Sequence, residues 1–217
     1  MTMTRSVPPS PAATGATAPM PAATGATMTA LESLCATAQL SDEARGILGE
    51  VPPGPPADFV RALVEREQFA DAVRLIAHAL PRREAVWWAW VCARRSAGAS
   101  PPPAIAGALD AVERWIAQPD DANRRTAMKA AEEADIGTPA GCAGLAAFFS
   151  GGSIAPPDAP AMPPAEHISA RAVAGSVVLA AVVAEPELAA EKFRAYVQQG
   201  LDVADRTGAW AAITSRG

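Results

Sequence analysis

The chain has 217 residues, half of them hydrophobic, and a formal net charge of −5 at pH 7. That length is enough for one domain with a sizeable core, and the acidic balance is a poor electrostatic match for the phosphates of a nucleic acid. The three cysteines form no C-x-x-C pair, which argues against a disulfide framework and indicates reduced thiols in a cytoplasmic protein.

The N-terminal segment is a tail of low complexity. The sequence PAATGAT occurs twice, at residues 11–17 and 21–27, in a stretch with almost no large apolar side chains. Such a chain cannot bury enough apolar surface to offset the entropy lost on ordering. We therefore expect residues 1–29 to be disordered and residues 30–217 to form the folded domain, unless translation begins at Met28 and the tail is never made.

Two short helices and a proline break open the domain. The first helix is expected over residues 31–37, and the second after Ser41, whose side chain can cap it. The sequence VPPGPP, residues 51–56, then forms a Pro-rich connection that no helix crosses. Asp58 can cap the helix that follows this connection.

The clearest helical period lies between residues 69 and 80. Apolar residues recur there at i, i+3, i+4 and i+7, and Pro81 stops the helix. The opposite face of this helix carries polar residues, which we expect at the surface. They are Asp71, Arg74 and His78.

The next helix, expected over residues 82–97, contains the sequence RREAVWWAWVCARR. Gly98 and a Pro-rich connection at residues 100–103 end it. A helix to about residue 117 follows, and then another over residues 121–134. That last helix should pack close to a neighbour, because its inner face is made of small residues. They are Ala127, Ala130, Ala131 and Ala134, and Gly137 is placed to cap the helix.

The C-terminal third is also helical. Thr138 and Pro139 are typical of a helix start, and a further Pro-rich connection covers residues 155–164. The helix expected over residues 166–185 has an apolar run shorter than the roughly 20 residues that a bilayer needs, so we expect a core helix and no membrane span. A final helix completes an all-α single domain, which we predict to be a bundle or irregular array of seven to nine helices.

The tryptophan-rich helix allows two interpretations. At about 100° per residue, Trp87 and Trp90 lie about 60° apart around the helix, while Trp88 points nearly the opposite way from Trp90. In the interpretation that we favour, the helix is central and surrounded, and the indoles are core mass. In the other, Trp87, Trp90 and Arg94 form a partly open face that binds a protein partner, with a cation-π contact between Trp90 and Arg94.

The sequence contains no motif for catalysis or cofactor binding. His78 and His167 are the only histidines; neither lies in a metal-ligand motif, and the cysteines lack zinc-site spacing. No G-x-S-x-G motif is present, and no glycine-rich stretch is followed by G-K-[ST]. We therefore expect no catalytic residue, no metal and no cofactor.

Four linked blocks resemble a family of uncharacterised bacterial proteins that share a domain of unknown function. They are ADAVRLIAHALPRREAVWWAWVCARR, GTPAGCAGLAAFFSGGSIAPP, HISARAVAGSVVLAA and AYVQQGLDVADR. The resemblance runs from about Pro56 to the C-terminus. Members of that family are associated with type VI secretion gene clusters, which implies an accessory or adaptor part of a contractile secretion apparatus. The family brings no catalytic residues to transfer.

The favoured hypothesis is a non-enzymatic, cytoplasmic helical interaction protein, an accessory or chaperone-like adaptor of a bacterial secretion system. Its partner would be a component of that apparatus or a secreted cargo protein, and neither nucleic acid nor a membrane span is expected. The alternative hypothesis is an enzyme or small-ligand-binding protein with a pocket between helices. In that pocket Trp87, Trp90, Arg94 and His167 would converge. A third hypothesis, an immunity protein, fits the size and acidity but has no motif behind it.

Overall fold

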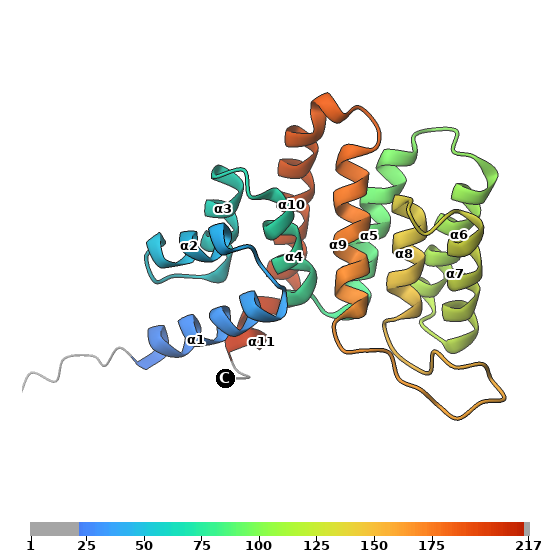
Figure 1. The fold of residues 1–217 in the computed structure, drawn as a ribbon, viewed down its shortest axis with the longest axis horizontal. Coiled ribbons are helices and arrows are strands. Elements are labelled where there is room, and N and C mark those ends of the chain that lie inside the picture. Colours follow the sequence, from blue (N-terminus) through green and yellow to red (C-terminus); the bar gives the residue numbers. More distant parts are fainter. Residues whose placement is uncertain (1–21, 215–217) are drawn as a thin grey trace, which may run out of the picture.

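A computed structural model describes residues 22–214 of the protein, and the side chains of residues 30–213. Within that range the chain forms eleven α-helices, one short 3-10 helix and no strand (Figure 1). They are α1 (Ala22–Thr37), α2 (Asp42–Glu50), α3 (Pro56–Glu65), α4 (Phe69–Ala79), α5 (Arg82–Ala97), α6 (Pro103–Ala117), α7 (Asp121–Glu133), α8 (Pro139–Phe148), α9 (Ile168–Val182), η1 (Pro186–Leu188), α10 (Ala189–Thr207) and α11 (Ala209–Thr214). The all-α prediction is confirmed.

The number of helices and the first boundary differ from the predictions. Eleven α-helices exceed the predicted seven to nine, in part because Gly208, with a φ of +65°, ends α10 and a separate short helix follows. The first helix begins at Ala22, inside the segment expected to be disordered, where alanine supplies strong helix propensity. Residues 1–21 of that predicted tail lie outside the described residues.

Helix α9 lies in the middle of the molecule, between α4 and α10 on one side and α5 and α8 on the other (Figure 1). It is the predicted core helix, and Val173, Val177 and Ala181 along it have no exposed surface. Helices α6 and α7 lie beyond α8, and α1 to α3 lie at the opposite end near α4. In the described part of the chain no single helix has the length and apolar composition to cross a membrane; α9 and Pro186–Thr207 meet the criterion only as a pair, bent by 112°.

Capping residues in the sequence fix several helix ends. The side chain of Ser41 accepts a hydrogen bond from an amide in the first turn of α2, and Thr138 does the same for α8. Helix α5 follows Pro81 and ends at Gly98, whose φ of +73° suits glycine. These predicted ends are confirmed because each depends only on residues close in sequence.

Two predicted caps were wrong. Asp58 does not cap α3, because Pro56 already begins the helix, and its carboxylate instead pairs with Arg61 at 2.7 Å. After α7 the left-handed residue is Asp135, with a φ of +68°, rather than Gly137. The Asp135 carboxylate accepts a hydrogen bond from the Gly137 amide at 2.8 Å, a local bond of the kind that lets aspartate adopt this conformation.

Asp71 is buried, although the sequence pattern places it on the polar face of α4. Only 4% of the residue is exposed. Its carboxylate accepts hydrogen bonds from the amide and the hydroxyl of Ser41, both at 3.0 Å, and pairs with Arg74 at 2.9 Å. Asp71 therefore ties the start of α2 to α4, a tertiary contact that helical periodicity does not encode.

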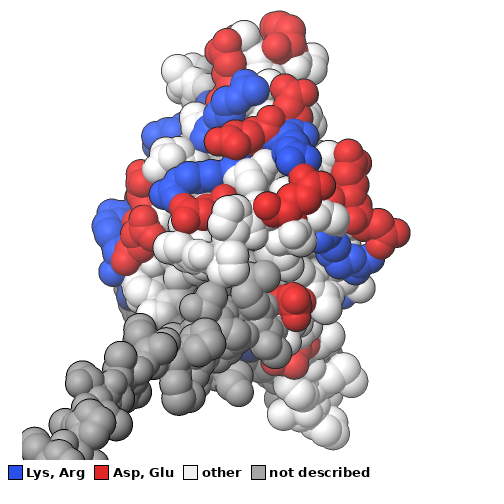
Figure 2. Space-filling model, turned by 90° about the vertical axis from the view of Figure 1, so that its left-hand side faces the viewer, with Lys and Arg blue, Asp and Glu red and all other residues white. Residues whose placement is uncertain are grey.

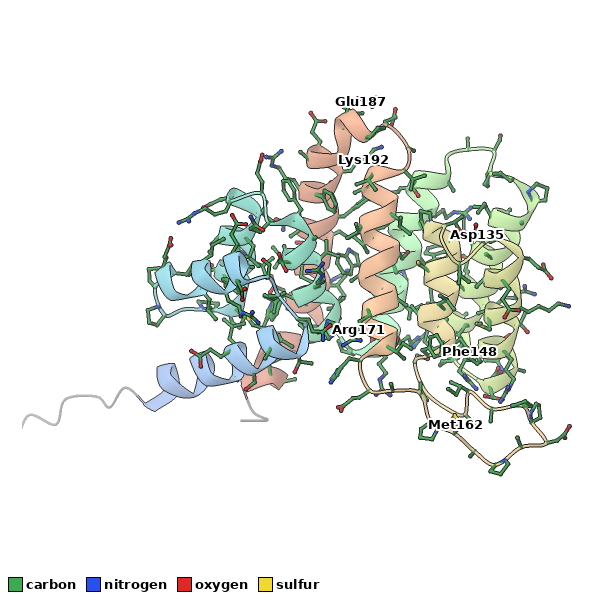
Figure 3. All side chains as sticks on the ribbon, in the orientation of Figure 1. Asp135, Phe148, Met162, Arg171, Glu187 and Lys192 are labelled. Carbon is green, nitrogen blue, oxygen red and sulfur yellow. The ribbon has the colours of Figure 1, made fainter. Side chains whose placement is uncertain are left out.

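The Pro-rich connection between α8 and α9 is held at its start by two arginines of α7. The buried side chain of Arg124 donates to the Ser153 carbonyl at 2.6 Å. Arg125 donates to the carbonyls of Ser153 and Ala155 at 3.1 and 2.9 Å. Beyond this anchored start the connection extends past the helix ends, where Met162 lies exposed (Figure 3).

Helices α7 and α8 pack closely, as the alanine face predicts. Ala127 and Ala131 have no exposed surface. A Cβ added to Gly144 of α8 would lie 2.8 Å from the carbonyl oxygen of Ala127 and 2.7 Å from the Cβ of Ala131. The two helices can approach to this distance only because position 144 is glycine.

We therefore expect Gly144→Ala to lower the free energy of unfolding by about 1–3 kcal/mol, the usual cost of overpacking a core. Gly46→Ala in α2 is the matched control, since its added Cβ would meet nothing within 4 Å. This control should raise stability by up to about 1 kcal/mol, because alanine is the better helix former. Urea denaturation followed by circular dichroism measures both values, and equal changes in the two variants would contradict the close packing.

Candidate functional site

Trp88 is the inward-facing tryptophan of α5. It has no exposed surface, and its Nε1–H donates to the carbonyl of Tyr196 on α10 at 3.0 Å. Gly200 permits this approach, because a Cβ there would lie 2.9 Å from both the Trp88 ring and the side chain of Ile76. Helices α4, α5 and α10 therefore meet at one indole, and for Trp88 the core interpretation is confirmed.

Trp87 and Trp90 are half-buried and border the outward face of α5. The Trp90 Nε1–H donates to a carbonyl of α6 at 2.9 Å, and the guanidinium of Arg94 lies 5.7 Å from its ring centroid. The guanidinium of Arg206 from α10 lies 5.9 Å from the ring of Trp87. The cation-π contact expected between Trp90 and Arg94 is confirmed. We refer to Trp87, Trp90, Arg94, Arg95 and Arg206 as the α5 surface.

The arginines of α5 have no carboxylate partner among the described residues. Arginines of α2, α3, α4, α7 and α10 do form ion pairs with Asp or Glu. Figure 2 shows the contrasting end of the molecule near α2 and α3, where basic and acidic side chains are interspersed. Carboxylates pair with the arginines of α2 and α3, whereas the arginines of α5 form no ion pair with a described residue. The arginines concerned are Arg82, Arg83, Arg94 and Arg95.

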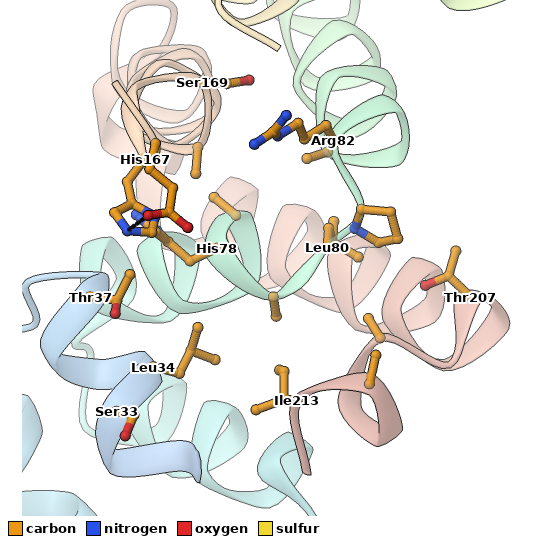
Figure 4. Close-up of a pocket in the computed structure, with 18 of the residues that line it drawn as sticks. Ser33, Leu34, Thr37, His78, Leu80, Arg82, His167, Ser169, Thr207 and Ile213 are labelled. Carbon is orange, nitrogen blue, oxygen red and sulfur yellow. Dashed lines mark ion pairs between the residues drawn. The ribbon is translucent and has the colours of Figure 1, made fainter. Parts of the chain in front are cut away.

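A cleft of about 580 Å³ lies at the other end of α5 (Figure 4). Its walls come from α1, the junction of α4 with α5, the start of α9, and the junction of α10 with α11. Figure 4 shows the Arg82 side chain extending from α5 toward α9. The apolar lining includes Leu34, Leu80 and Ile213, and the polar lining includes His78, Arg82 and His167.

Both histidines meet at one side of this cleft, with ring centroids 5.7 Å apart. His78 is not the surface residue that we expected, because α9 covers it. Its Nδ1 lies 2.9 Å from the carbonyl of Arg74, which can only accept, so Nδ1 carries the proton and Nε2 has a free lone pair in the neutral ring. That Nε2 is buried and has no hydrogen-bond partner in the described part of the chain. His167 lies next to Glu166, with 3.7 Å between Nε2 and the carboxylate.

The environment of His78 disfavours its charged form. Burial lowers the pKa of His78 below the ordinary histidine value, and Coulombic interactions with Arg171 and His167 lower it further. The hydrogen bond to the Arg74 carbonyl acts in the opposite direction but is the smaller effect. His78 is therefore neutral at pH 7, in a region where positive charge predominates.

Cys35 and Cys92 are core residues and Cys142 is half-buried, and none of the three has the environment of a nucleophile. Burial raises the pKa of Cys35 to about 12 and also raises the pKa of Cys92 and Cys142, so little thiolate forms near neutral pH. Within residues 22–214, no group of three His, Cys, Asp or Glu side chains is arranged to hold a metal ion.

The structure does not bring together all the residues singled out from the sequence. The cleft that contains His167 is not lined by Trp87, Trp90 or Arg94. The single pocket that the small-ligand hypothesis required, with these four residues together, therefore does not form. Sequence reasoning also missed Arg82. Its only local signal was its position in the first turn of a helix, where a positive charge is unfavourable.

The comparisons with known proteins identify a family whose function is unknown. The model of a family of unknown function (DUF6931) matches residues 59–204. The chain belongs to this family. The DUF6931 match includes Trp87, Trp90 and both histidines, whereas the parts of the cleft contributed by α1 and α11 lie outside it. No curated protein and no solved structure matches the chain.

The three tryptophans of α5 should differ in their effect on stability. Trp88→Ala removes a fully buried indole and should lower the free energy of unfolding by about 3–5 kcal/mol. Trp90→Ala removes a side chain that is already partly in water and should cost less, within about 0.5–3 kcal/mol. Urea denaturation of both variants tests the difference, and an equal loss would mean that Trp90 is as much a core residue as Trp88.

The histidine environment predicts a pH dependence of stability. Because the pKa of His78 is lower in the folded chain than its value of about 6.5 when unfolded, protons bind the unfolded chain more readily. The stability associated with neutral His78 is therefore complete above about pH 6.5 and is lost as the pH falls through the folded pKa. His78→Gln should flatten this part of the profile, measured as unfolding free energy between about pH 5 and 8. A variant profile parallel to wild type would refute this account.

Proposed function

We propose that the protein is a non-enzymatic interaction protein that binds an acidic segment of another protein through the α5 surface. The observation that carries this proposal is the uncompensated charge of Arg94 and Arg95 beside two half-exposed indoles. Tryptophan and arginine are the side chains most enriched among residues that dominate binding energy at protein interfaces. A carboxylate-rich partner would supply the missing counter-charges.

The α5 surface is also held in place before any partner arrives. The Trp90 Nε1–H is already bonded to a carbonyl of α6, so a partner need not provide an acceptor for it. The guanidinium groups of Arg94 and Arg206 already lie over the two indoles. Side chains that are ordered in the free protein lose less entropy on binding. This preorganisation favours an interface over an ordinary solvated helix face.

A protein partner fits these features better than a nucleic acid does. The chain as a whole carries a net charge of −5, so the positive charge of the α5 surface is local and the long-range field opposes a polyanion. A protein segment with a few carboxylates can neutralise a local surface without approaching the remaining acidic side chains.

We further propose that the partner is a component or cargo of a bacterial type VI secretion system, and that the protein acts in the cytoplasm as an accessory or chaperone-like adaptor. This proposal rests on the association with such gene clusters that the resemblance of the four sequence blocks implies. The α5 surface supports partner binding in general and does not depend on that assignment.

Charge reversal tests the proposed interface. The tagged protein is used to capture partners from the producing bacterium, in the wild-type form, as R94E/R95E, and as the matched control R61E/R66E. Arg61 and Arg66 are also exposed arginines, but each already has a carboxylate partner. We expect an acidic protein that the wild type and the control retain and that R94E/R95E loses by at least tenfold, with binding weakened by salt.

The fold of each variant is checked by its thermal melting curve. Equal capture by R94E/R95E and wild type would reject the α5 surface as the interface. Retention of nucleic acid in place of an acidic protein would reject the partner class.

A further inference from the structure

The cleft beside the histidines combines an apolar wall with a positively charged end. Leu34 of α1, Leu80 after α4 and Ile213 of α11 supply apolar surface. At the other side lie His78, Arg82 and His167 (Figure 4). None of these residues belongs to the α5 surface, so this cleft is a separate place on the molecule.

Two polar groups at this end have unused hydrogen-bonding capacity. The Nε2 atom of His78 is buried without a partner in the described part of the chain. Arg82 donates from one nitrogen to the Ser150 carbonyl at 3.0 Å and forms no ion pair with the described carboxylates, which leaves further N–H groups available. The free N–H groups of Arg82 can donate to a ligand directly, whereas Nε2 of neutral His78 is an acceptor and needs a proton before it can donate to an anion.

The charge of this end favours an anion. Arg82 lines the cleft from α5, and Arg171 of α9 contributes positive charge at His78. Glu166 is the only acidic residue among the described lining residues, and its side chain is 80% exposed. Helix α1 contributes only Ser33 and Thr37 as polar lining residues, and α10 with α11 only Thr207.

We propose that this cleft binds an amphipathic carboxylate, with its carboxylate between Arg82 and the two histidines and its apolar part against Leu34, Leu80 and Ile213. A guanidinium binds a carboxylate through two parallel hydrogen bonds, which gives it both strength and orientation. The volume of about 580 Å³ is in the range of small-molecule sites, which are mostly apolar with a few placed polar groups. The lining of this cleft divides between apolar and polar side chains, which suits a ligand with an apolar part and a charged end.

Carboxylate binding by His78 requires its protonated form. In the neutral ring both the free Nε2 and a carboxylate oxygen are acceptors, so they cannot bond to each other. A bound carboxylate therefore stabilises His78 with a proton on Nε2, and binding takes up protons from solution. Affinity should rise as the pH falls from 8 to 6, a range in which an aliphatic carboxylate stays ionised.

Octanoate is the probe, measured by isothermal titration calorimetry on the full-length chain. We expect saturable binding at one site that is weakened about tenfold or more in R82Q, the cost of losing a charged hydrogen-bond partner. R83Q is the matched control, because Arg83 is the next residue on the same helix but does not line the cleft. E166Q should bind octanoate more tightly, since it removes the carboxylate that repels the ligand. All three positions are exposed, so these substitutions leave the core intact.

Two further ligands separate the parts of the proposal. Octan-1-ol has the same chain without the charge and should bind much more weakly than octanoate. Inorganic phosphate has charge without the chain and should also bind weakly. Affinity for either compound equal to that for octanoate overturns the proposal, as does equal affinity of R82Q and R83Q, affinity independent of pH, or the absence of saturable binding. Capture of the acidic partner by R82Q should be unchanged, so this test and that of the α5 surface fail independently.

Discussion

The contact between Trp88 and Gly200 fixes the rotation of α5, and both candidate sites depend on that rotation. The indole occupies the space that a Cβ on Gly200 would fill, and its Nε1–H is bonded to the Tyr196 carbonyl. A ring held by packing and by a hydrogen bond has one orientation in a close-packed core. With Trp88 directed inward, the 100° step of the helix turns Trp87 about 100° and Trp90 about 160° away from it, so both lie toward the partly open side of α5.

Because the rotation of α5 is fixed, its two ends contribute to two different candidate sites. The first turn of α5 carries Arg82 into the cleft, while its C-terminal half carries Arg94 and Arg95 onto the α5 surface. Helix α9 packs beside α5 and brings His167 to the cleft at its own start. Both sites are therefore built on helices that also contribute side chains to the core, which suits groups that must hold a fixed geometry.

Features that depend on neighbouring residues were predictable from the sequence, and features that depend on tertiary contacts were not. The ends of α5 at Pro81 and Gly98 follow from local proline and glycine chemistry. Asp71 and His78 lie on the polar face of α4, as the periodicity indicates, yet α2 covers one and α9 the other. The meeting of His78 with His167 joins segments on either side of a long Pro-rich connection, and no local pattern contains that information.

The four arginines of α5 differ in how their charge interacts with the helix dipole, because two lie in the last turn and two in the first. Arg94 and Arg95 lie in the last turn, where positive charge stabilises the helix dipole by about 0.3–1 kcal/mol, so the fold tolerates them without a carboxylate. Arg82 and Arg83 lie in the first turn, where the same interaction is unfavourable. Arg83 is accounted for by its bond to the carbonyl of Ile116 on α6 at 2.7 Å. Arg82 has a comparable bond, to the carbonyl of Ser150 at 3.0 Å, but it also lines the cleft, where Glu166 is the only acidic residue among the described lining residues. Arg82 therefore differs from Arg83 in lining the cleft, and a charge that departs from the helix-dipole preference at such a place is typical of a functional residue.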